Sequence, residues 1–263
     1  NIDLDFPSVG ATENIILASI YAEGITQITN AAMEPEIVDL AKCLNKMGAK
    51  IAGAGTNIIK ITGVQKLKDI GYKVMQDRIE AGTLLCAGAI TGGNICLNYR
   101  TPEHITPILN KLEEAGCDIN IEKNKVYMQA PKKMKAVDIK TMPYPGFPTD
   151  MQSIFASILT TAKGTSVIVE NIFENRYRYT AELNKMGAKI TTEGKTAVIK
   201  GVKKLSGATV KSTDLRGGAC MVLAGLSAKG ITTVTNVEYI LRGYENLDKK
   251  LNSLGAKITI QKD

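Results

Sequence analysis

The sequence predicts an α/β protein built from four tandem copies of one β-α-β-α-β-β unit. The first observation is a stretch of eight residues, 44–51, that recurs letter for letter at 183–190 and more loosely at 112–119 and 251–258. Its glycines recur at intervals of 68, 71 and 68 residues, as Gly48, Gly116, Gly187 and Gly255. A second marker is the asparagine that ends a strand-like run in each copy. It recurs at intervals of 68, 73 and 65 residues, as Asn30, Asn98, Asn171 and Asn236. Two markers in phase indicate a repeat architecture.

Each copy contains a helix that is apolar on nearly every side, and we expect these helices to be buried. They cover 15–22, 84–90, 154–162 and 220–228. A glycine follows each of them, as Gly24, Gly92, Gly164 and Gly230. The second helix of a copy is amphipathic, with apolar residues at 37, 40, 41, 44 and 47 in the first copy. Pro35 and Pro102 are expected at the first position of such helices, where a missing N–H is tolerated.

The turn-rich residues 63–76 separate the first copy from the rest and predict a domain boundary. We expect one repeat unit in residues 1–73 and a second domain of three units in residues 74–263. A βαβ unit cannot cover its own sheet, so neighbouring units should pack around their buried helices.

Composition excludes several classes of protein. The 263 residues contain no apolar run of about 20, and the N-terminus lacks the pattern of a signal peptide, so we expect a cytoplasmic protein without a membrane segment. Five scattered cysteines without a C-x-x-C pair, and a single histidine, argue against a zinc site or a disulfide framework. We expect reduced thiols in the core, His104 on a surface helix, no metal and no cofactor.

The net charge of +7 indicates anionic partners. The distribution of lysines and arginines indicates which basic residues are candidates for binding them. Twenty-seven lysines are spread along the chain, as expected of a solvated surface. The six arginines all lie in or beside predicted loops: Arg78, Arg100, Arg176, Arg178, Arg216 and Arg242. A guanidinium can grip a carboxylate or phosphate with two hydrogen bonds, which lysine cannot do.

Polar turns precede the apolar helices at 8–12, 77–80, 147–152 and 213–218. Helix N-termini favour anions, so these turns are candidate binding loops. Alternatively, Ser8, Thr149 and Thr213 are simple helix N-caps. Gly217 and Gly218 permit close approach either of a ligand or of a neighbouring helix.

The turns before the second helices are charged as well, so the same two positions of the unit carry acids and arginines. If the copies pack alike, these loops converge on one cleft, where a general base would lie among phosphate-binding arginines. Its residues would be Asp150, Glu174, Arg176, Asp214, Arg216 and Arg242. The alternative is a set of salt bridges between loops of successive units.

Six motifs, in order along the chain, resemble those of the enolpyruvyl transferase family. They are 8–14, 34–40, 147–152, 173–176, 213–216 and 241–244. The resemblance covers the chain from end to end and is closest to the branch that acts on UDP-N-acetylglucosamine. It implies an inverse α/β barrel fold, with two similar domains of three units each closing on the substrate.

The resemblance implies transfer of the enolpyruvyl group of phosphoenolpyruvate to the 3′-hydroxyl of UDP-N-acetylglucosamine. Addition would give a tetrahedral phospholactoyl intermediate, from which phosphate is eliminated; in bacteria the reaction opens peptidoglycan synthesis. The implied catalytic residues are Asp150 as base, with Asp214, Arg216 and Arg242. The implied substrate-binding residues are Ser8, Val9, Gly10, Arg78, Ile172, Glu174 and Arg176.

The departure from the family pattern is that the family has six units and four are present. The resemblance therefore implies a C-terminal fragment, whose partner would be the missing N-terminal part with its lysine–asparagine pair and its mobile loop bearing a reactive cysteine or aspartate. No cysteine of this chain falls in such a loop, because Cys86 and Cys220 lie in apolar helices and Cys96 in a strand. We expect the fragment alone to be inactive.

Three alternatives remain open at the level of sequence. The first is a 5-enolpyruvylshikimate-3-phosphate synthase-like transferase, against which the motif at residue 8 and the one at 147–150 argue for a nucleotide sugar. The second is a basic nucleic-acid-binding repeat protein, which the low aromatic content of 5% and the absence of tryptophan disfavour. The third is a non-catalytic scaffold, which the charged loops make less attractive.

Overall fold

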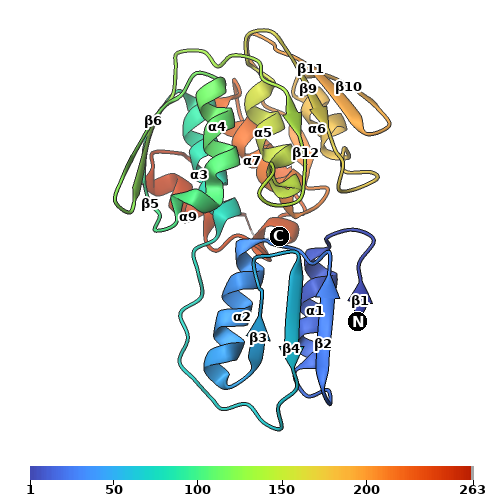
Figure 1. The fold of residues 1–263 in the computed structure, drawn as a ribbon. Helices are drawn as coiled ribbons and strands as arrows, with labels where there is room; N and C mark the ends of the chain where they lie inside the picture. Colours follow the sequence, from blue (N-terminus) through green and yellow to red (C-terminus); the bar gives the residue numbers. More distant parts are fainter. Residues whose placement is uncertain (262–263) are drawn as a thin grey trace. The chain divides into compact units, whose positions relative to one another are not determined.

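The computed structural model describes residues 1–261, which divide into two compact units (Figure 1). The first unit contains Asn1–Gln76 together with the short segment Pro143–Gly146, and the second contains the rest. The compact units thus divide after Gln76, and the sequence did not indicate that a segment from the third copy joins the first unit. The expected boundary after residue 73 concerned the domains of the family and stays a prediction.

The first unit is one complete β-α-β-α-β-β copy, as the repeat predicts. Its elements are β1 (Ile2–Asp3), α1 (Val9–Ser19), β2 (Ile25–Thr29), α2 (Pro35–Met47), β3 (Lys50–Ala52) and β4 (Ile58–Thr62). The sheet order is β1-β2-β4-β3, with β1 parallel to β2 and the other pairs antiparallel. Isoleucines such as Ile16, Ile28, Ile37 and Ile59 form its core.

The second unit holds the other three copies. Its first copy contains α3 (Arg78–Thr91), β5 (Asn94–Asn98), η1 (Pro102–Ile105), α4 (Thr106–Glu114), β6 (Asp118–Glu122) and β7 (Lys125–Gln129). The next contains β8 (Ile139–Lys140), η2 (Thr149–Met151), α5 (Gln152–Leu159), β9 (Thr165–Val169), α6 (Tyr179–Lys185), β10 (Lys189–Glu193) and β11 (Thr196–Lys200). The last contains β12 (Thr209–Lys211), α7 (Leu215–Ser227), β13 (Thr233–Thr235), α8 (Glu238–Leu241) and α9 (Leu247–Ser253).

The copies of the second unit pack around the helices α3, α5 and α7, which contact one another (Figure 1). Every residue of α5 is buried, and so are most residues of α3 and α7, which confirms the expectation from their apolar composition. The expectation was wrong for α1, where only Thr12, Ile16 and Ser19 are buried and Leu17 is 48% exposed. Within its own unit, α1 has a single helical neighbour, α2, and therefore cannot bury all its sides.

The predicted strand pattern holds only in part for the second unit. Within residues 1–261 the copy that begins with α3 lacks a leading strand, and the last copy lacks the closing pair. Three separate sheets result, in the orders β5-β7-β6, β10-β11-β9-β8 and β12-β13. The enolpyruvyl transferase-like α/β arrangement is therefore confirmed, while these sheets do not join into a closed barrel in the described part of the chain.

The repeated motif marks the same helix end in each copy. Gly48, Gly116, Gly187 and Gly255 all have positive φ, between 89° and 109°, a conformation that glycine adopts without strain. In three of the four copies an asparagine three residues before the glycine fixes the chain that follows, while the second copy has Glu113 there. Asn45 accepts from the backbone N of Ile51 and donates to its carbonyl, both at 2.8 Å. Matching bonds join Asn184 to Ile190 and Asn252 to Ile258. Local geometry therefore explains why these letters recur.

The cysteines correct one detail of the sequence analysis. Cys86, Cys117 and Cys220 are buried, as expected, but Cys96 is exposed in β5 and Cys43 is only partly buried. Burial raises the pKa of the Cys117 thiol to about 11 and raises the pKa values of Cys86 and Cys220 well above their ordinary values. Because the thiolate is the nucleophile, the three buried thiols are unreactive near neutral pH.

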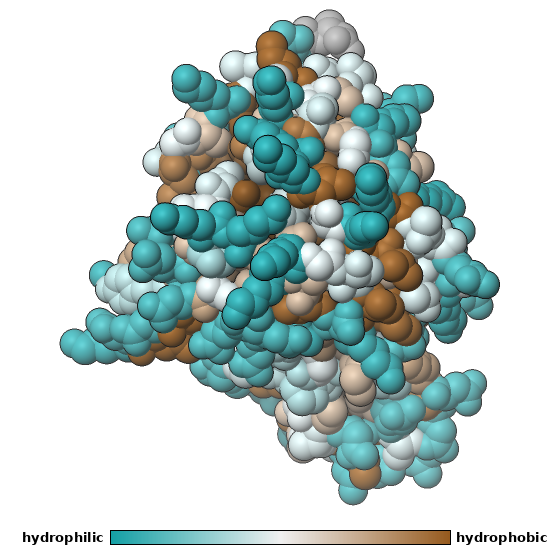
Figure 2. Space-filling view, turned by 90° about the horizontal axis from the view of Figure 1, so that it is seen from above, coloured by the Kyte–Doolittle hydropathy of each residue, from teal (hydrophilic) through white to brown (hydrophobic). Residues whose placement is uncertain are grey.

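Side chains on the face shown in Figure 2 are mostly hydrophilic, with scattered apolar patches. This agrees with the expectation that most lysines belong to a solvated surface.

Candidate active site

Asp150 lies in the short helix η2, at the entrance to the buried helix α5. The preceding Phe147 is buried and packs edge-on against Phe155 of α5, with ring centroids 5.5 Å apart. This contact anchors the loop, while the Asp150 side chain remains 36% exposed. The carboxylate is therefore both fixed in position and accessible to a ligand.

Two arginines from different copies hold this carboxylate. Arg176, from the loop after β9, donates from Nη2 to Oδ1 of Asp150 at 2.7 Å. Arg216, in the first turn of α7, donates to Oδ2 from Nη2 at 2.8 Å and from Nε at 3.1 Å. The predicted convergence of Asp150, Arg176 and Arg216 is thus present within the second unit. Two guanidinium groups around one carboxylate leave one positive charge in excess, which favours an anionic ligand.

Each of the two arginines lies over an aromatic ring that belongs to one of the six motifs described above. Arg176 lies over the ring of Phe173, 4.7 Å from its centroid, and Arg216 over the ring of Tyr244 at 5.4 Å. Tyr244 is buried, and its hydroxyl lies 2.9 Å from Oγ1 of Thr83. Because Thr83 gives its own hydrogen to the carbonyl of Ile79, Tyr244 is the donor in that bond. The Arg216 side chain is therefore positioned by a ring that is itself fixed.

The charges of this cluster stabilise one another. Burial alone would raise the pKa of the Asp150 carboxyl, but Arg216 and Arg176, through charge and hydrogen bonds, lower it below its usual value. Burial alone would lower the pKa of Arg216, and the charge of Asp150 raises it instead. In this arrangement Asp150 is a weak base.

Asp214 lies in the turn before a buried helix, as predicted, and its carboxylate is the N-cap of that helix, α7. One of its oxygens accepts from the backbone N of Arg216 at 3.0 Å and of Gly217 at 2.9 Å. Thr213, which the alternative interpretation made the cap, instead donates to Asp214 at 3.0 Å. The cap accounts for an aspartate here without a catalytic role, although it also fixes the backbone that carries Arg216.

Glu174 and Arg242 do not join the cluster through direct contacts. Both are exposed, and neither forms an ion pair with Asp150 in the part of the chain that the structure describes. Arg242 lies over the ring of Tyr239, 5.8 Å from its centroid. Of the six loop residues expected to meet, Asp150 therefore contacts Arg176 and Arg216 directly. Asp214 bonds to the backbone of Arg216, and Glu174 and Arg242 form no ion pair with Asp150 in the described residues.

Ser8 is the N-cap of α1, where its hydroxyl accepts from the backbone N of Ala11 at 3.3 Å. This confirms the cap interpretation for Ser8, whereas Thr149 is not a cap. Val9 and Gly10 form the first turn of the same helix, in the first compact unit.

Arg78 and Ile172 belong to the second unit. Arg78 is buried at the start of α3, and Ile172 is partly buried in the loop after β9. A side chain at Gly217 would meet Thr213 and Asp214, and one at Gly218 would meet Ser212 and Ile240. These two glycines therefore serve close packing within the protein.

Sequence reasoning missed Glu170, which is 1% exposed at the end of β9 and accepts from Thr149, the neighbour of Asp150. The signal was a charged residue directly after the apolar run 167–169. A carboxylate in that position must be satisfied by donors, so it marks a buried polar network.

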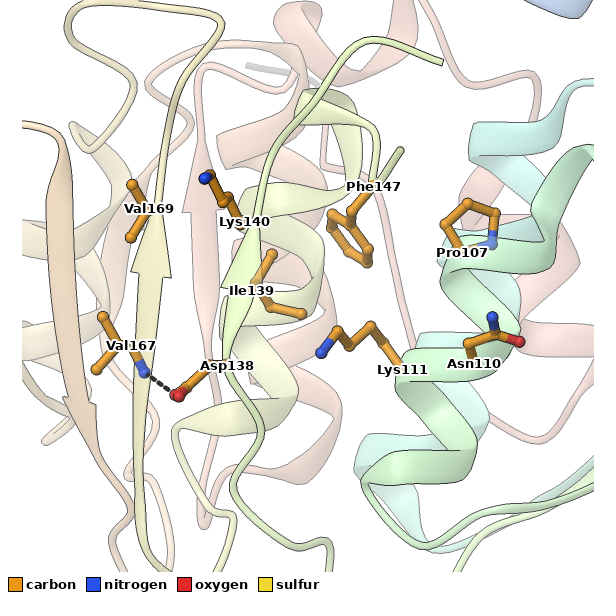
Figure 3. A pocket seen from close by; sticks show the side chains of 9 residues that line it. All are labelled: Pro107, Asn110, Lys111, Asp138, Ile139, Lys140, Phe147, Val167 and Val169. Carbon is orange, nitrogen blue, oxygen red and sulfur yellow. Dashed lines mark hydrogen bonds between the residues drawn. The ribbon is translucent and has the colours of Figure 1, made fainter. Parts of the chain in front are cut away.

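A cavity of about 460 Å³ in the second unit was not predicted either. It lies between α4 and the strands β8 and β9, with an apolar floor formed by Ile139, Phe147, Val167 and Val169 (Figure 3). Lys111 and Lys140 also line the cavity, and in Figure 3 the Lys111 side chain points towards Ile139. Asp138 accepts from the backbone N of Val167 at 2.7 Å. None of the predicted site residues lines this cavity, so it is distinct from the arginine–aspartate cluster.

Within residues 1–261 there is no group of three His, Cys, Asp or Glu side chains placed to hold a metal ion. None of the helices formed by those residues is long and apolar enough to cross a membrane.

The sequence allowed either a substrate cleft with a general base or a set of salt bridges between loops of successive units. The geometry around Asp150 is compatible with both, because its contact to Arg216 is an ion pair between two copies. A purely structural ion pair, however, needs no surplus cation beside it. The exposed carboxylate and the second arginine favour a centre that binds an anion next to a proton acceptor.

The second unit combines tandem α/β repeats around packed helices with a carboxylate held by two arginines. The comparison with known families assigns a chain of this kind to a family of carboxyvinyltransferases. Residues 1–251 match the family of EPSP synthase (3-phosphoshikimate 1-carboxyvinyltransferase), and the chain belongs to this family.

Curated relatives narrow the comparison further. The chain is 54% identical over 257 residues to UDP-N-acetylglucosamine 1-carboxyvinyltransferase 1 of Caldanaerobacter subterraneus subsp. tengcongensis, covering 98% of this chain and 62% of that protein. It is 52% identical over 257 residues to UDP-N-acetylglucosamine 1-carboxyvinyltransferase 2 of Carboxydothermus hydrogenoformans, covering 97% of this chain and 61% of that protein. The chain thus spans about three-fifths of the length of these relatives.

Solved structures share the fold. The enolpyruvyl transferase NikO from Streptomyces tendae superposes with a TM-score of 0.85 at 25% identity, covering 94% of this chain and 59% of that one. EPSP synthase from Acinetobacter baumannii superposes with a TM-score of 0.75 at 22% identity, covering 99% and 63%.

Proposed function

We propose that the protein containing this chain transfers the enolpyruvyl group of phosphoenolpyruvate to the 3′-hydroxyl of UDP-N-acetylglucosamine, with release of phosphate. The observation that carries the proposal is the Asp150 carboxylate held between Arg176 and Arg216. The names of relatives at 52–54% identity support the choice of acceptor.

In the proposed reaction the anionic groups of phosphoenolpyruvate attract the guanidinium groups of Arg176 and Arg216. Asp150, released from both hydrogen bonds, becomes more basic and accepts the proton of the sugar hydroxyl, whose oxygen bonds to C2 of phosphoenolpyruvate. As this bond forms, the double bond of phosphoenolpyruvate opens and C3 takes up a proton from solvent, which gives the tetrahedral adduct. In the second step C3 loses a proton to solvent as phosphate leaves, and the double bond is restored. By resemblance to the family, Arg242 would add positive charge for the phosphate, Glu174 would bind substrate and Asp214 would take part in catalysis.

The remaining predicted residues would bind the acceptor. Ser8, Val9 and Gly10 offer a helix N-terminus to the UDP-sugar, Ile172 contacts the nucleotide, and Arg78 adds positive charge. Such a protein would work in the cytoplasm at the entry to peptidoglycan synthesis. The chain of 263 residues by itself would be inactive, since it spans only part of its relatives.

Phosphate release by the complete gene product that contains this chain tests the proposal. Phosphoenolpyruvate is supplied with either UDP-N-acetylglucosamine or shikimate 3-phosphate. We expect release only with the nucleotide sugar, and none from the 263-residue chain alone. Release with shikimate 3-phosphate only would establish the synthase-like alternative, and release with neither acceptor would refute the proposed transfer.

A further inference from the structure

The buried Glu170 takes no part in the chemistry proposed above, yet four hydrogen bonds end on its carboxylate. Oε1 accepts from the hydroxyl of Thr141 at 2.9 Å, and from the backbone N of Ile172 at 2.9 Å and of Phe173 at 3.1 Å. Oε2 accepts from the hydroxyl of Thr149 at 2.9 Å. Because Glu170 is 1% exposed, these bonds replace the water that its charge would otherwise require.

The four donors belong to the two segments that carry the candidate site. Thr141 and Thr149 flank the loop that leads to Asp150, while Ile172 and Phe173 begin the loop that leads to Arg176. A single carboxylate thus joins both loops at the end of β9.

The two hydrogen bonds that link Arg176 to Glu170 through the hydroxyl of Thr149 have one allowed direction. Nη1 of Arg176 donates to Oγ1 of Thr149 at 2.6 Å. A guanidinium only donates and a carboxylate only accepts, so the hydroxyl hydrogen of Thr149 must point to Glu170. A lone pair of Thr149 is thereby held towards Arg176.

We propose that Glu170 is a positioning residue, which acts through Thr149 to hold Arg176 in its grip on Asp150. The proposal rests on the proposed function for its effect on catalysis, whereas its structural part stands on the hydrogen bonds alone. It predicts that a change at Glu170 alters the binding of the phosphate-bearing substrate without any contact to that substrate.

The substitution Glu170→Gln keeps the size of the side chain and reverses one contact. With its oxygen retained at the backbone donors, its amide nitrogen faces Thr149 as a donor. The hydroxyl then meets two donors, the amide and Arg176, and its own hydrogen has no acceptor. The opposite amide orientation places a donor against the backbone N–H groups of Ile172 and Phe173 and is worse still.

The kinetic test uses the complete gene product. We expect Glu170→Gln to raise KM for phosphoenolpyruvate by about tenfold, the scale of a weakened charge-assisted hydrogen bond. Thr149→Val should have a similar effect while leaving the backbone bonds of Glu170 intact, and Thr149→Ser should restore the parent value. Glu193→Gln, at an exposed glutamate of the same sheet, is the matched control. An unchanged KM in both Glu170→Gln and Thr149→Val would overturn the role in catalysis.

A second measurement separates this proposal from the proposed function. NMR spectra of isotopically labelled arginine side chains of the same complete gene product report directly on the guanidinium of Arg176. We expect slow exchange of the Arg176 guanidinium protons in the parent and in Thr149→Ser, and fast exchange in Glu170→Gln and Thr149→Val. Slow exchange in all four proteins would refute the positioning role even if the parent transfers enolpyruvate. If the parent transfers nothing, this readout still decides the positioning role.

Discussion

Arg216, in the first turn of α7, binds a single carboxylate oxygen of Asp150 through two of its nitrogens, at 2.8 and 3.1 Å. Sixty-six residues of sequence separate the two side chains, which come from successive copies of the repeat. The contact exists because the buried helices α5 and α7 pack directly against each other and bring their N-terminal turns together. The repeat architecture thus creates the candidate site.

Replacing Arg216 by lysine should weaken this centre even though the charge is kept. Lysine cannot supply two nitrogens in the planar geometry of a guanidinium, so we expect KM for phosphoenolpyruvate to rise by at least about tenfold. Steady-state kinetics of the complete gene product measure the change. Arg178→Lys, on an exposed arginine near the same site, is the control. Equal KM values for the Arg216 and Arg178 variants would contradict the assignment.

Acid should remove the stabilisation contributed by Asp150. Because its folded-state pKa is lowered, the group stabilises the fold above its unfolded pKa, and this contribution is lost as the pH falls through the folded value. The difference in unfolding free energy between the parent and Asp150→Asn should therefore be constant near neutral pH and shrink below about pH 4. Denaturant titrations over this range measure it. A difference that grows towards low pH would show that the pKa is raised instead.

Substitutions at Asp214 separate capping from charge. Alanine removes the cap of α7 and should lower the unfolding free energy by about 1 kcal/mol, whereas asparagine caps helices as well as aspartate does. We expect Asp214→Asn to unfold like the parent in urea. If Asp214→Asn is stable and still loses phosphate release, the carboxylate charge acts in catalysis. If it is as unstable as Asp214→Ala, the cap assignment fails.

The first unit offers an independent test of stability. Tyr72, in the segment that follows β4, donates its hydroxyl to the carboxylate of Asp39 at 2.8 Å, and the other carboxylate oxygen accepts from the backbone N of Met75. Tyr72→Phe should therefore cost about 1 kcal/mol of unfolding free energy in urea denaturation. Tyr21→Phe, at a tyrosine that is 61% exposed, should cost nothing measurable. A cost of the same size for both would mean that the bond to Asp39 adds no stability.

Much of the fold could be predicted from sequence because its signals are local. The glycine that ends each amphipathic helix needs a positive φ, and the asparagine before it bonds to a residue six positions later. In the sequence the glycine recurs in all four copies and the asparagine in three of them. The exposure of α1 was not predictable, since apolar composition reports what a helix can bury and not which neighbours it has.

The candidate site was predictable in its residue types and less so in its contacts. Asp150, Arg176 and Arg216 meet as expected, but an aspartate before a helix has the same pattern whether it caps or catalyses, as Asp214 shows. Glu170 stayed hidden because two of its four donors, Thr141 and Thr149, lie 29 and 21 residues away in sequence, and only the packed structure brings them to its carboxylate.

The rate of phosphate release by Asp150→Asn tests the central claim most directly. Asparagine keeps the shape of the side chain but cannot accept the proton of the sugar hydroxyl. At saturating phosphoenolpyruvate and UDP-N-acetylglucosamine we expect kcat to fall by at least about a hundredfold, the usual contribution of a general base. Calorimetry should still detect binding of the nucleotide sugar. A variant that binds the sugar and turns over within about threefold of the parent would contradict the role of Asp150 as the base.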